Sequence, residues 1–274
     1  MKAIFNSRII NTSEPLILSS NRAFCYGDGL FETIVTGKDR IDLIGAHLGR
    51  VERGCAVMGM ELPGIISIEY IQECIETLVA ENNIEGNVRT RLIVWRNEGG
   101  LYAPDNSSIS FLIEVKPSDK PFFRSAQKLG ISEHYHTQLS PISFAKTLNA
   151  LQYVMAGKQM KDNGWDEILL TDNKGNISET HIANIFWLIN DELYTPKLDT
   201  GCIDGVMRRA LIEKAKSVDI SINEVMQTQE VLSNAESIFS TNASGITWFK
   251  TFNGRELNNP EPKLAPIIKQ LLRP

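Results

Sequence analysis

The chain has 274 residues, of which 42% are hydrophobic and 22% are charged, and this is the composition of a globular protein with room for a substantial core. Its formal net charge of −5 at pH 7 offers no electrostatic footprint for nucleic acid or for an acidic membrane. We therefore expect neither a nucleic-acid partner nor a membrane partner.

The cysteines and the N-terminal residues bear on the cellular compartment. Four cysteines stand far apart with no CxxC pair, so neither a disulfide framework nor a zinc site is expected. The first residues, "MKAIFNSRIINTSE", interrupt their apolar side chains with Asn, Ser and Arg, unlike a signal peptide. No run approaches the roughly 18 apolar residues of a membrane span. These observations favour a cytoplasmic protein without a bound metal.

The first part of the chain reads as strands and amphipathic helices. Short apolar runs bounded by turn residues predict strands, and apolar residues at helical spacing predict helices. Strands are expected at 2–10, 14–20, 88–95 and 109–116, and helices at 46–62 and 67–82. The loop "RNEGGLYAPDNSS" between the last two strands is long and contains glycine, so we expect it to shape substrate choice.

The segment "PSDKPFFR", residues 117–124, is polar, contains two prolines and is the best linker candidate. Beyond it, strands are expected at 166–172, 181–189 and 236–242, and helices at 205–218 and 262–273. Strands and helices are mixed in both halves without strict βαβ alternation, which favours an α+β protein of two domains over one parallel sheet. The expected division is a smaller N-terminal domain at 1–116, the linker at 117–124, and a larger C-terminal domain at 125–274.

Two motifs that suggest ligand sites are incomplete. "GDGLFE" begins like a dinucleotide fingerprint but has Glu32 where a third glycine belongs, so we read it as a turn between two strands. His134 and His136 would share one face of a strand, but no third metal ligand stands near them in the sequence.

The stretch "SFAKTLNALQYVMAGKQM", residues 143–160, places a lysine before an apolar helix. A helix starting near Thr147 would carry Leu148, Leu151 and Met155 on one core-facing stripe, with Lys146 at its entrance. Loss of hydration lowers the pKa of a lysine amine, and a neutral amine attacks carbonyls to form a Schiff base. From the residues alone, a lysine that extends its ammonium into solvent remains the alternative.

If the carbonyl belongs to pyridoxal phosphate, other groups are required. The phosphate needs a helix N-terminus and a fixed cation, and the pyridine nitrogen needs a carboxylate. Candidates in the sequence are Val206 and Met207 at a helix start after Gly205, Arg50 as the cation, Glu179 as the carboxylate, and Thr241 or Asn242 as a further phosphate contact. Each has an ordinary structural alternative, such as a solvated helix face for Arg50 or a loop acid for Glu179.

Taken in order, several segments resemble the class IV aminotransferase family, the fold type IV pyridoxal-phosphate enzymes. The segments are "YGDGLFETI", "HLGRVERGC", "RLIVWRNEGG", "KTLNALQYVMA", "DEILLTDNKGNISETHIANIFW", "YTPKLDTGCIDGVMRRAL" and "FSTNASGIT", which cover nearly the whole chain. The resemblance implies a two-domain α+β fold, pyridoxal phosphate in the cleft between the domains, and a homodimer that completes the site.

The resemblance also implies a role for each candidate residue. Lys146 matches the Schiff-base lysine, Glu179 the partner of the pyridine nitrogen, Arg50 the phosphate-binding arginine of an "HxxR" pattern, Val206 and Met207 the phosphate-binding amides, and Asn242 the other phosphate contact, with Thr241 one residue away. Arg96 and Arg91 are candidates for binding a substrate carboxylate, since a guanidinium can pair with it bidentately. Their alternative is that one is a strand-edge charge and the other flanks a loop.

Two reactions fit the family resemblance. "YGDGLFET", "HLGRVERGC" and "STNA" look more similar to the aminodeoxychorismate lyases, which release pyruvate and the folate precursor 4-aminobenzoate. The alternative is an amino-acid transaminase of the D-amino-acid or branched-chain type, and Leu151 stands where branched-chain enzymes typically have a tyrosine. A non-catalytic pyridoxal-phosphate binder is a third possibility. We expect the lyase.

Overall fold

The computed structural model describes residues 1–38 and 40–272, and the chain divides into two compact units. Unit 1 is Met1–Lys120 together with Ala145–Asn149, and unit 2 is Pro121–Phe144 together with the chain from Ala150 onward. The division after Lys120 lies inside the segment 117–124 that the sequence suggests as a linker. Ala145–Asn149 differs from expectation, because these residues belong to unit 1 and not to the C-terminal unit.

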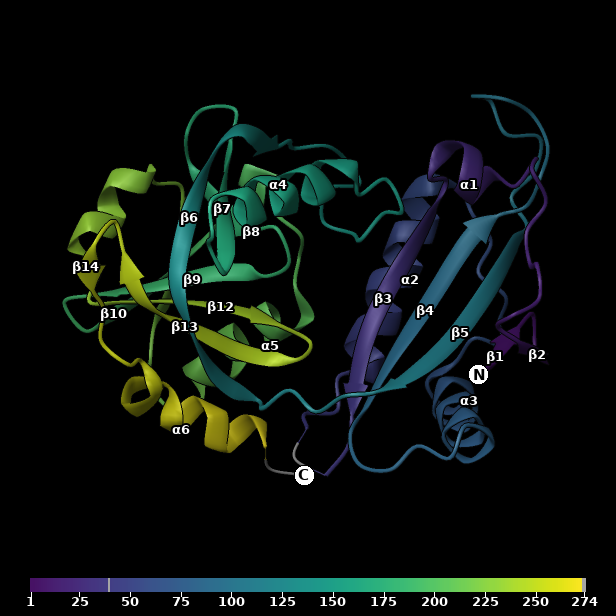
Figure 1. The fold of residues 1–274 in the computed structure, drawn as a ribbon, viewed down its shortest axis with the longest axis horizontal. Helices are drawn as coiled ribbons and strands as arrows, with labels where there is room; N and C mark the ends of the chain where they lie inside the picture. Colours follow the sequence, from purple (N-terminus) through teal and green to yellow (C-terminus); the bar gives the residue numbers. More distant parts are fainter. Residues whose placement is uncertain (39, 273–274) are drawn as a thin grey trace. The chain divides into compact units, whose positions relative to one another are not determined.

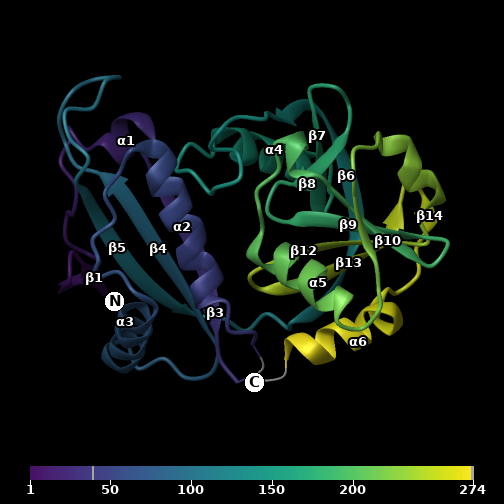
Figure 2. The same cartoon turned by 180° about the vertical axis from the view of Figure 1, so that it is seen from behind.

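Unit 1 is an antiparallel sheet with helices packed against it (Figure 1 and, from behind, Figure 2). Its strand order is β2-β1-β5-β4-β3. The strands are β1 (Lys2–Phe5), β2 (Arg8–Asn11), β3 (Gly29–Thr36), β4 (Val88–Arg96) and β5 (Ile109–Pro117), and the helices are α1 (Arg22–Tyr26), α2 (Ile44–Met58) and α3 (Ile68–Glu81). The strand expected at 14–20 is absent, since most of this segment has no regular structure.

Helix α2 packs on β3, and α3 packs on β1 and β5. The buried side chains of α2 recur at helical spacing, so one face of the helix meets the sheet. Helix α3 begins where the Ser67 side chain accepts a hydrogen bond from the Tyr70 amide, the usual capping contact. These contacts fix α2 along β3, which begins at the second glycine of "GDGLFE"; the first glycine caps α1, so the motif joins a helix to a strand and not two strands.

Unit 2 is built on a larger sheet whose strand order is β11-β10-β9-β12-β13-β6-β7-β8. Strand β8 also pairs with β9, so the path from β9 through β12, β13, β6 and β7 to β8 closes on itself. The strands are β6 (Phe123–Thr137), β7 (Glu167–Asp172), β8 (Ile177–Thr180), β9 (Asn184–Ile189), β10 (Glu192–Pro196), β11 (Ile222–Val225), β12 (Ser237–Asn242), β13 (Gly245–Phe252) and β14 (Arg255–Glu256). The helices are α4 (Leu151–Asp162), α5 (Val206–Lys216) and α6 (Glu261–Leu271), with 3-10 turns at Leu198–Thr200 and Gln229–Asn234.

Helix α4 corrects the helix expected from Thr147. It begins at Leu151, and both Leu151 and Met155 are exposed, so the apolar stripe does not face the core. The preceding residues are drawn away from helical geometry because the Phe31 amide donates to the Lys146 carbonyl at 2.8 Å. Within residues 1–38 and 40–272, no helix combines the length and apolar character needed to cross a membrane.

Candidate functional site

Lys146 is fixed by backbone pairing with β3. Besides the bond from the Phe31 amide, the Leu148 amide donates to the Gly29 carbonyl at 2.9 Å. A Cβ on Gly29 would lie 2.8 Å from Leu148 Cδ1, so this close approach requires glycine. The Lys146 side chain is half-buried, and its Nζ lies 4.7 Å from the centre of the Phe31 ring. The aromatic face replaces part of the hydration of the amine.

A buried ionic cluster lies beside this segment. Arg50 donates from Nε and from one terminal nitrogen to the two oxygens of Glu32, at 2.7 and 2.6 Å. His47 Nδ1 lies 2.7 Å from Glu32 Oε2, and all three side chains are buried. Burial tends to raise the pKa of Glu32, but the charge of Arg50 and the bonds from His47 and Arg50 lower it to about 2. Burial lowers the pKa of His47; the bond to Glu32 and the charge of Glu32 oppose this, but the charges of Arg50 and Lys146 add to the lowering. The cluster is therefore a carboxylate that orients Arg50, with a neutral imidazole beside it.

Glu32 and His47 were not identified from the sequence. A usable signal was present: His47 and Arg50 are three residues apart and must share a helix face. The cysteine at the end of the "RVERGC" run has a packing role, because Cys55 is buried and burial raises the pKa of its thiol to about 11. A Cβ on Gly54 would lie 2.6 Å from Leu30 Cδ1, so this glycine lets α2 approach β3 closely.

In unit 2, Glu179 lies on β8, so it is not the loop acid that was its ordinary alternative. It pairs with Asn184 on β9, at the point where the ring of strands closes. The buried carboxylate accepts from the Tyr153 hydroxyl at 2.7 Å on Oε1 and from the Ile203 amide at 3.1 Å on Oε2. Asn184 Nδ2 donates to the Ile203 carbonyl at 2.8 Å. The peptide groups of Ile203 are thus held by both side chains.

Two residues further on, α5 begins with an open N-terminus. Gly205 is the capping residue, and no side chain in the described part of the chain caps the helix there. The first amides of a helix, here those of Val206 and Met207, have no acceptor within the helix. A Cβ on Gly205 would lie 1.8 Å from Asn184 Oδ1, so the approach of Asn184 requires glycine. This end of α5 is suited to bind an anion.

Strand β12, against which α5 packs, carries the two alternative phosphate contacts. Asn242 is engaged: its Oδ1 accepts from the Ser244 amide at 2.9 Å, and its Nδ2 donates to the Ile182 carbonyl at 3.4 Å. Thr241 Oγ1 is buried and has no hydrogen-bond partner within residues 1–38 and 40–272. Because a buried hydroxyl without a partner is costly, this distribution favours Thr241 over Asn242 as a ligand contact.

These groups fit pyridoxal phosphate. Unit 2 carries a buried, hydrogen-bonded carboxylate for a pyridine nitrogen, and an uncapped helix start with an unsatisfied hydroxyl for a phosphate. Unit 1 carries the half-buried amine of Lys146 and the oriented guanidinium of Arg50.

The two arginines suggested for a substrate carboxylate have different surroundings. Arg96 is buried and donates to Asp28 Oδ2 and to the carbonyls of Met58, Gly59 and Asn106. These contacts occupy most of its donors and favour a structural role. Arg91 is exposed, and its guanidinium carbon lies 5.1 Å from the centre of the Phe31 ring that also contacts Lys146. Arg91 is therefore the better placed of the two for a substrate.

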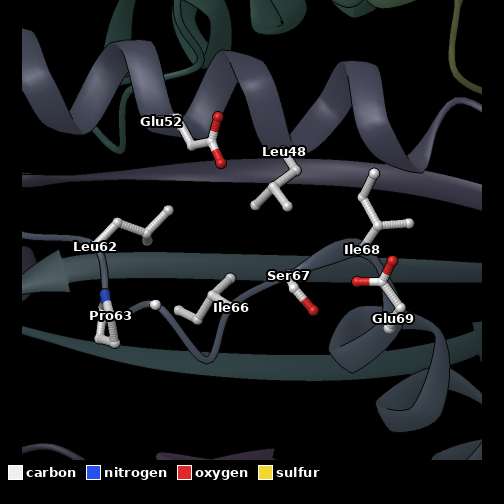
Figure 3. Close-up of a pocket in the computed structure, with 9 residues that line it drawn as sticks. Leu48, Glu52, Leu62, Pro63, Ile66, Ser67, Ile68 and Glu69 are labelled. Atoms are coloured by element: carbon white, nitrogen blue, oxygen red, sulfur yellow. The ribbon is translucent and has the colours of Figure 1, made fainter.

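A hollow of about 420 Å³ in unit 1 is lined by none of the candidate site residues discussed above (Figure 3). Its lining is largely apolar, with the hydroxyl of Ser67 and the carboxylates of Glu52 and Glu69, and no basic side chain of the described residues lines it. Its charge is unsuited to a phosphate or to a substrate carboxylate. Across the described ranges 1–38 and 40–272, no three His, Cys, Asp or Glu side chains are grouped to hold a metal ion.

Comparisons with known proteins identify the family of the chain. The family model described as amino-transferase class IV matches residues 29–250. Aminodeoxychorismate lyase of Bacillus subtilis (strain 168) is 27% identical over 244 residues, covering 87% of this chain and 82% of the lyase. D-alanine aminotransferase of Listeria monocytogenes serotype 1/2a (strain 10403S) is 24% identical over 280 residues, covering 99% and 93% of the two chains.

Among solved structures, a hypothetical aminotransferase from Mycobacterium tuberculosis, in its form with bound pyridoxal phosphate, superposes with a TM-score of 0.82 at 17% identity, covering 99% of this chain and 99% of that one. The α+β fold expected from the sequence is confirmed. Since the family model spans most of the sequence, this chain belongs to the class IV aminotransferase family, whose enzymes use pyridoxal phosphate as cofactor.

Proposed function

We propose that this enzyme is an aminodeoxychorismate lyase, which converts its substrate to 4-aminobenzoate and pyruvate. The observation that carries the proposal is the similarity to the Bacillus subtilis lyase over 87% of the chain. The absence of a tyrosine at Leu151 adds to it, because branched-chain transaminases typically have one at this position. The two products together contain all the atoms of the substrate, so this reaction needs no second substrate.

The proposal gives each residue a task. When bound, pyridoxal phosphate supplies an electron sink for the substrate carbon that loses its proton. Lys146 attaches the cofactor through Nζ, takes the proton from that carbon, and returns a proton to the departing enolpyruvyl group. Glu179 keeps the pyridine nitrogen protonated. The phosphate is bound by Arg50, the amides of Val206 and Met207, and the hydroxyl of Thr241.

Arg91 binds a carboxylate of the substrate in this proposal. Its guanidinium contacts the same aromatic ring as Lys146 Nζ, so a carboxylate held there would be near the reactive amine. Arg96 has its structural contacts instead and supports the loop that follows β4.

The alternative is an amino-acid transaminase of the D-amino-acid or branched-chain type. The similarity to the Listeria D-alanine aminotransferase over 99% of the chain favours it. In a transaminase the amino group remains on the cofactor until a 2-oxo acid accepts it, so a transaminase requires that second substrate.

The test is to give the purified, cofactor-loaded enzyme aminodeoxychorismate without any 2-oxo acid, and to follow 4-aminobenzoate together with pyruvate. Many turnovers in equal amounts would support the lyase. No product from an enzyme whose visible spectrum shows bound cofactor would refute it, and a panel of D- and L-amino acids would then identify the transaminase substrate. Lys146→Ala should abolish turnover, whereas a non-catalytic binder would keep its function.

A homodimer in the cytoplasm is also part of the proposal. The side chains of Phe24, Leu101 and Tyr102 are highly exposed, and Tyr102 lies 5.7 Å from the Tyr26 ring. Arg22 holds this loop by donating to three successive carbonyls, so the apolar surface is preformed for a second copy. Sedimentation of the enzyme and of Tyr102→Lys tests the dimer.

All four cysteines are unpaired thiols, as a reducing compartment requires.

A further inference from the structure

Tyr153 donates a hydrogen bond to Glu179, but it is not one of the residues proposed to contact the cofactor or the substrate. It lies in the first turn of α4, and its hydroxyl donates to Glu179 Oε1 at 2.7 Å. Burial raises the pKa of the Tyr153 phenol strongly, and the charge of Glu179 raises it further. The hydroxyl therefore keeps its proton and remains a donor at neutral and mildly alkaline pH.

We infer that Tyr153 is a positioning residue for the cofactor, whose hydroxyl keeps the Glu179 carboxylate ionised and oriented toward a pyridine nitrogen. The inference rests on the proposed role of Glu179. The residue would act through Glu179 and not by contact with the substrate.

The two bonds to Glu179 fix the carboxylate in two ways. Tyr153 holds one oxygen and the Ile203 amide holds the other, so rotation of the carboxylate would break one of the two bonds. Donation to the charged form also makes a carboxylate a weaker base. A proton shared between Glu179 and a pyridine nitrogen would then stay on the nitrogen, as an electron sink requires.

Cys202 is close enough for the charge of Glu179 to act on its thiol, and burial followed by that charge raises the pKa of the thiol to about 12. The thiol donates to the Lys197 carbonyl at 3.6 Å, so Tyr153 and the Ile203 amide are the donors to the carboxylate described above. The rest of Tyr153 has a separate function: its ring packs against the small cluster of Ala156, Ile168 and Leu170. Tyr153→Phe keeps that packing and removes the hydroxyl alone.

The chain offers a matched control in Tyr194. Its hydroxyl donates to Glu192 at 2.6 Å, but this pair lies at the surface of the same unit. Tyr194→Phe therefore removes the same kind of bond from a solvated carboxylate. Both variants would be prepared without cofactor, titrated with pyridoxal phosphate, and compared in dissociation constant and in the pH dependence of the visible absorbance.

We expect Tyr153→Phe to weaken cofactor binding about tenfold, the usual scale for a hydrogen bond to a charged group. The pH midpoint of the absorbance change should shift in Tyr153→Phe, while Tyr194→Phe should match the parent in both measurements. Incorporating a fluorinated tyrosine at position 153, which is a stronger donor, should shift the midpoint in the opposite direction. This second variant keeps the test decisive if the phenylalanine variant does not fold.

Glu179→Gln separates the inference from the proposal on which it rests. If Glu179→Gln binds pyridoxal phosphate as the parent does and keeps its absorbance midpoint, the assignment of Glu179 is wrong. If Glu179→Gln weakens binding but Tyr153→Phe behaves like Tyr194→Phe, the role of Tyr153 is overturned. In the double variant, Tyr153→Phe should add little to Glu179→Gln, because it acts through that carboxylate, and full additivity would contradict the inference.

Discussion

Thr241 and Asn242 are neighbours on β12, yet only the hydroxyl of Thr241 lacks a hydrogen-bond partner among the described residues. Replacing Thr241 by Val removes a buried hydroxyl that has no partner among the described residues, so the free energy of unfolding of the cofactor-free protein should rise by about 1 kcal/mol. The affinity for pyridoxal phosphate should fall about tenfold, because the phosphate loses a donor. Denaturant unfolding and cofactor titration measure the two quantities.

Asn242→Ala serves as the opposite case. It removes the acceptor of the Ser244 amide and should lower the free energy of unfolding by about 1 kcal/mol. Its cofactor affinity should stay close to that of the parent. If Asn242→Ala loses cofactor affinity and Thr241→Val does not, our choice between the two residues is wrong.

Replacing Arg91 and replacing Arg96 should likewise have different effects, one on substrate binding and the other on stability. Arg96→Ala leaves Asp28 with one fewer cation and three carbonyls without a donor, so we expect a loss of about 3 kcal/mol in the free energy of unfolding. Arg91→Ala removes an exposed side chain and should leave stability unchanged. It should raise KM for a carboxylate substrate at least tenfold, since a charged hydrogen bond is lost. Steady-state kinetics with an unchanged KM in Arg91→Ala would remove this residue from the substrate site.

Among the elements, α5 begins after Gly205, where the close approach of Asn184 leaves no room for a side chain. The backbone at Gly205 has a φ of −64°, which any residue adopts, so Gly205→Ala introduces no backbone strain. The added Cβ would instead displace Asn184 from the Ile203 carbonyl and disturb the peptide that also binds Glu179. We expect cofactor affinity to fall more than tenfold while α5 remains helical, as circular dichroism would show. Gly164→Ala is the control, because its Cβ would meet no neighbour, although its positive φ of 64° costs some stability.

Helices with a regular apolar pattern could be predicted from the sequence to within a few residues. The range 67–82 was expected for α3, and 205–218 for α5, because one face of each is buried at helical spacing. The apolar pattern around Lys146 predicted a helix from Thr147, which is wrong, because the backbone of residues 146–148 pairs with β3, more than a hundred residues earlier. Pairing at that separation leaves no local signal.

The candidate site was predictable where residue type and helix position sufficed, and not where side chains from distant segments meet. A glycine before an apolar helix indicates an open N-terminus without any tertiary information. The bond between Tyr153 and Glu179 joins two elements, and the cluster around Glu32 joins another two. Such contacts are determined by how each of the helices α2 and α4 packs against the sheet of its own unit, which the sequence pattern does not specify.

For the whole molecule, two buried carboxyls give the units opposite responses to acid. Glu32, in unit 1, has its pKa lowered from 4.5 to about 2, so its contribution of about 3 kcal/mol is present above pH 4.5 and is lost as the pH falls toward 2. Glu167, in unit 2, has its pKa raised from 4.5 to about 6, chiefly by burial. Its protonated form is favoured in the fold, so about 2 kcal/mol is present below pH 4.5 and is lost as the pH rises through 6.

Hydrogen exchange, corrected for the intrinsic effect of pH, should therefore show β7 and β12 gaining protection between about pH 7 and pH 4.5, while α2 and β3 lose protection only below pH 4.5. Glu167→Gln should abolish the gain in unit 2 and leave unit 1 unchanged. A parallel loss of protection in both units above pH 4.5 would contradict the assignment of these two carboxyls.

Because Ala145–Asn149 belong to unit 1, this unit cannot be completed until synthesis of the chain has passed well beyond residue 120. As the nascent chain leaves the ribosome, the first 120 residues emerge without the segment that pairs with β3, and Gly29 lacks the side chain of Leu148 beside it. Unit 1 is complete only after β6, a strand of unit 2, has been translated. Lys146, the proposed Schiff-base lysine, thus reaches its place beside β3 late, and a chain cut after residue 120 would leave unit 1 without it.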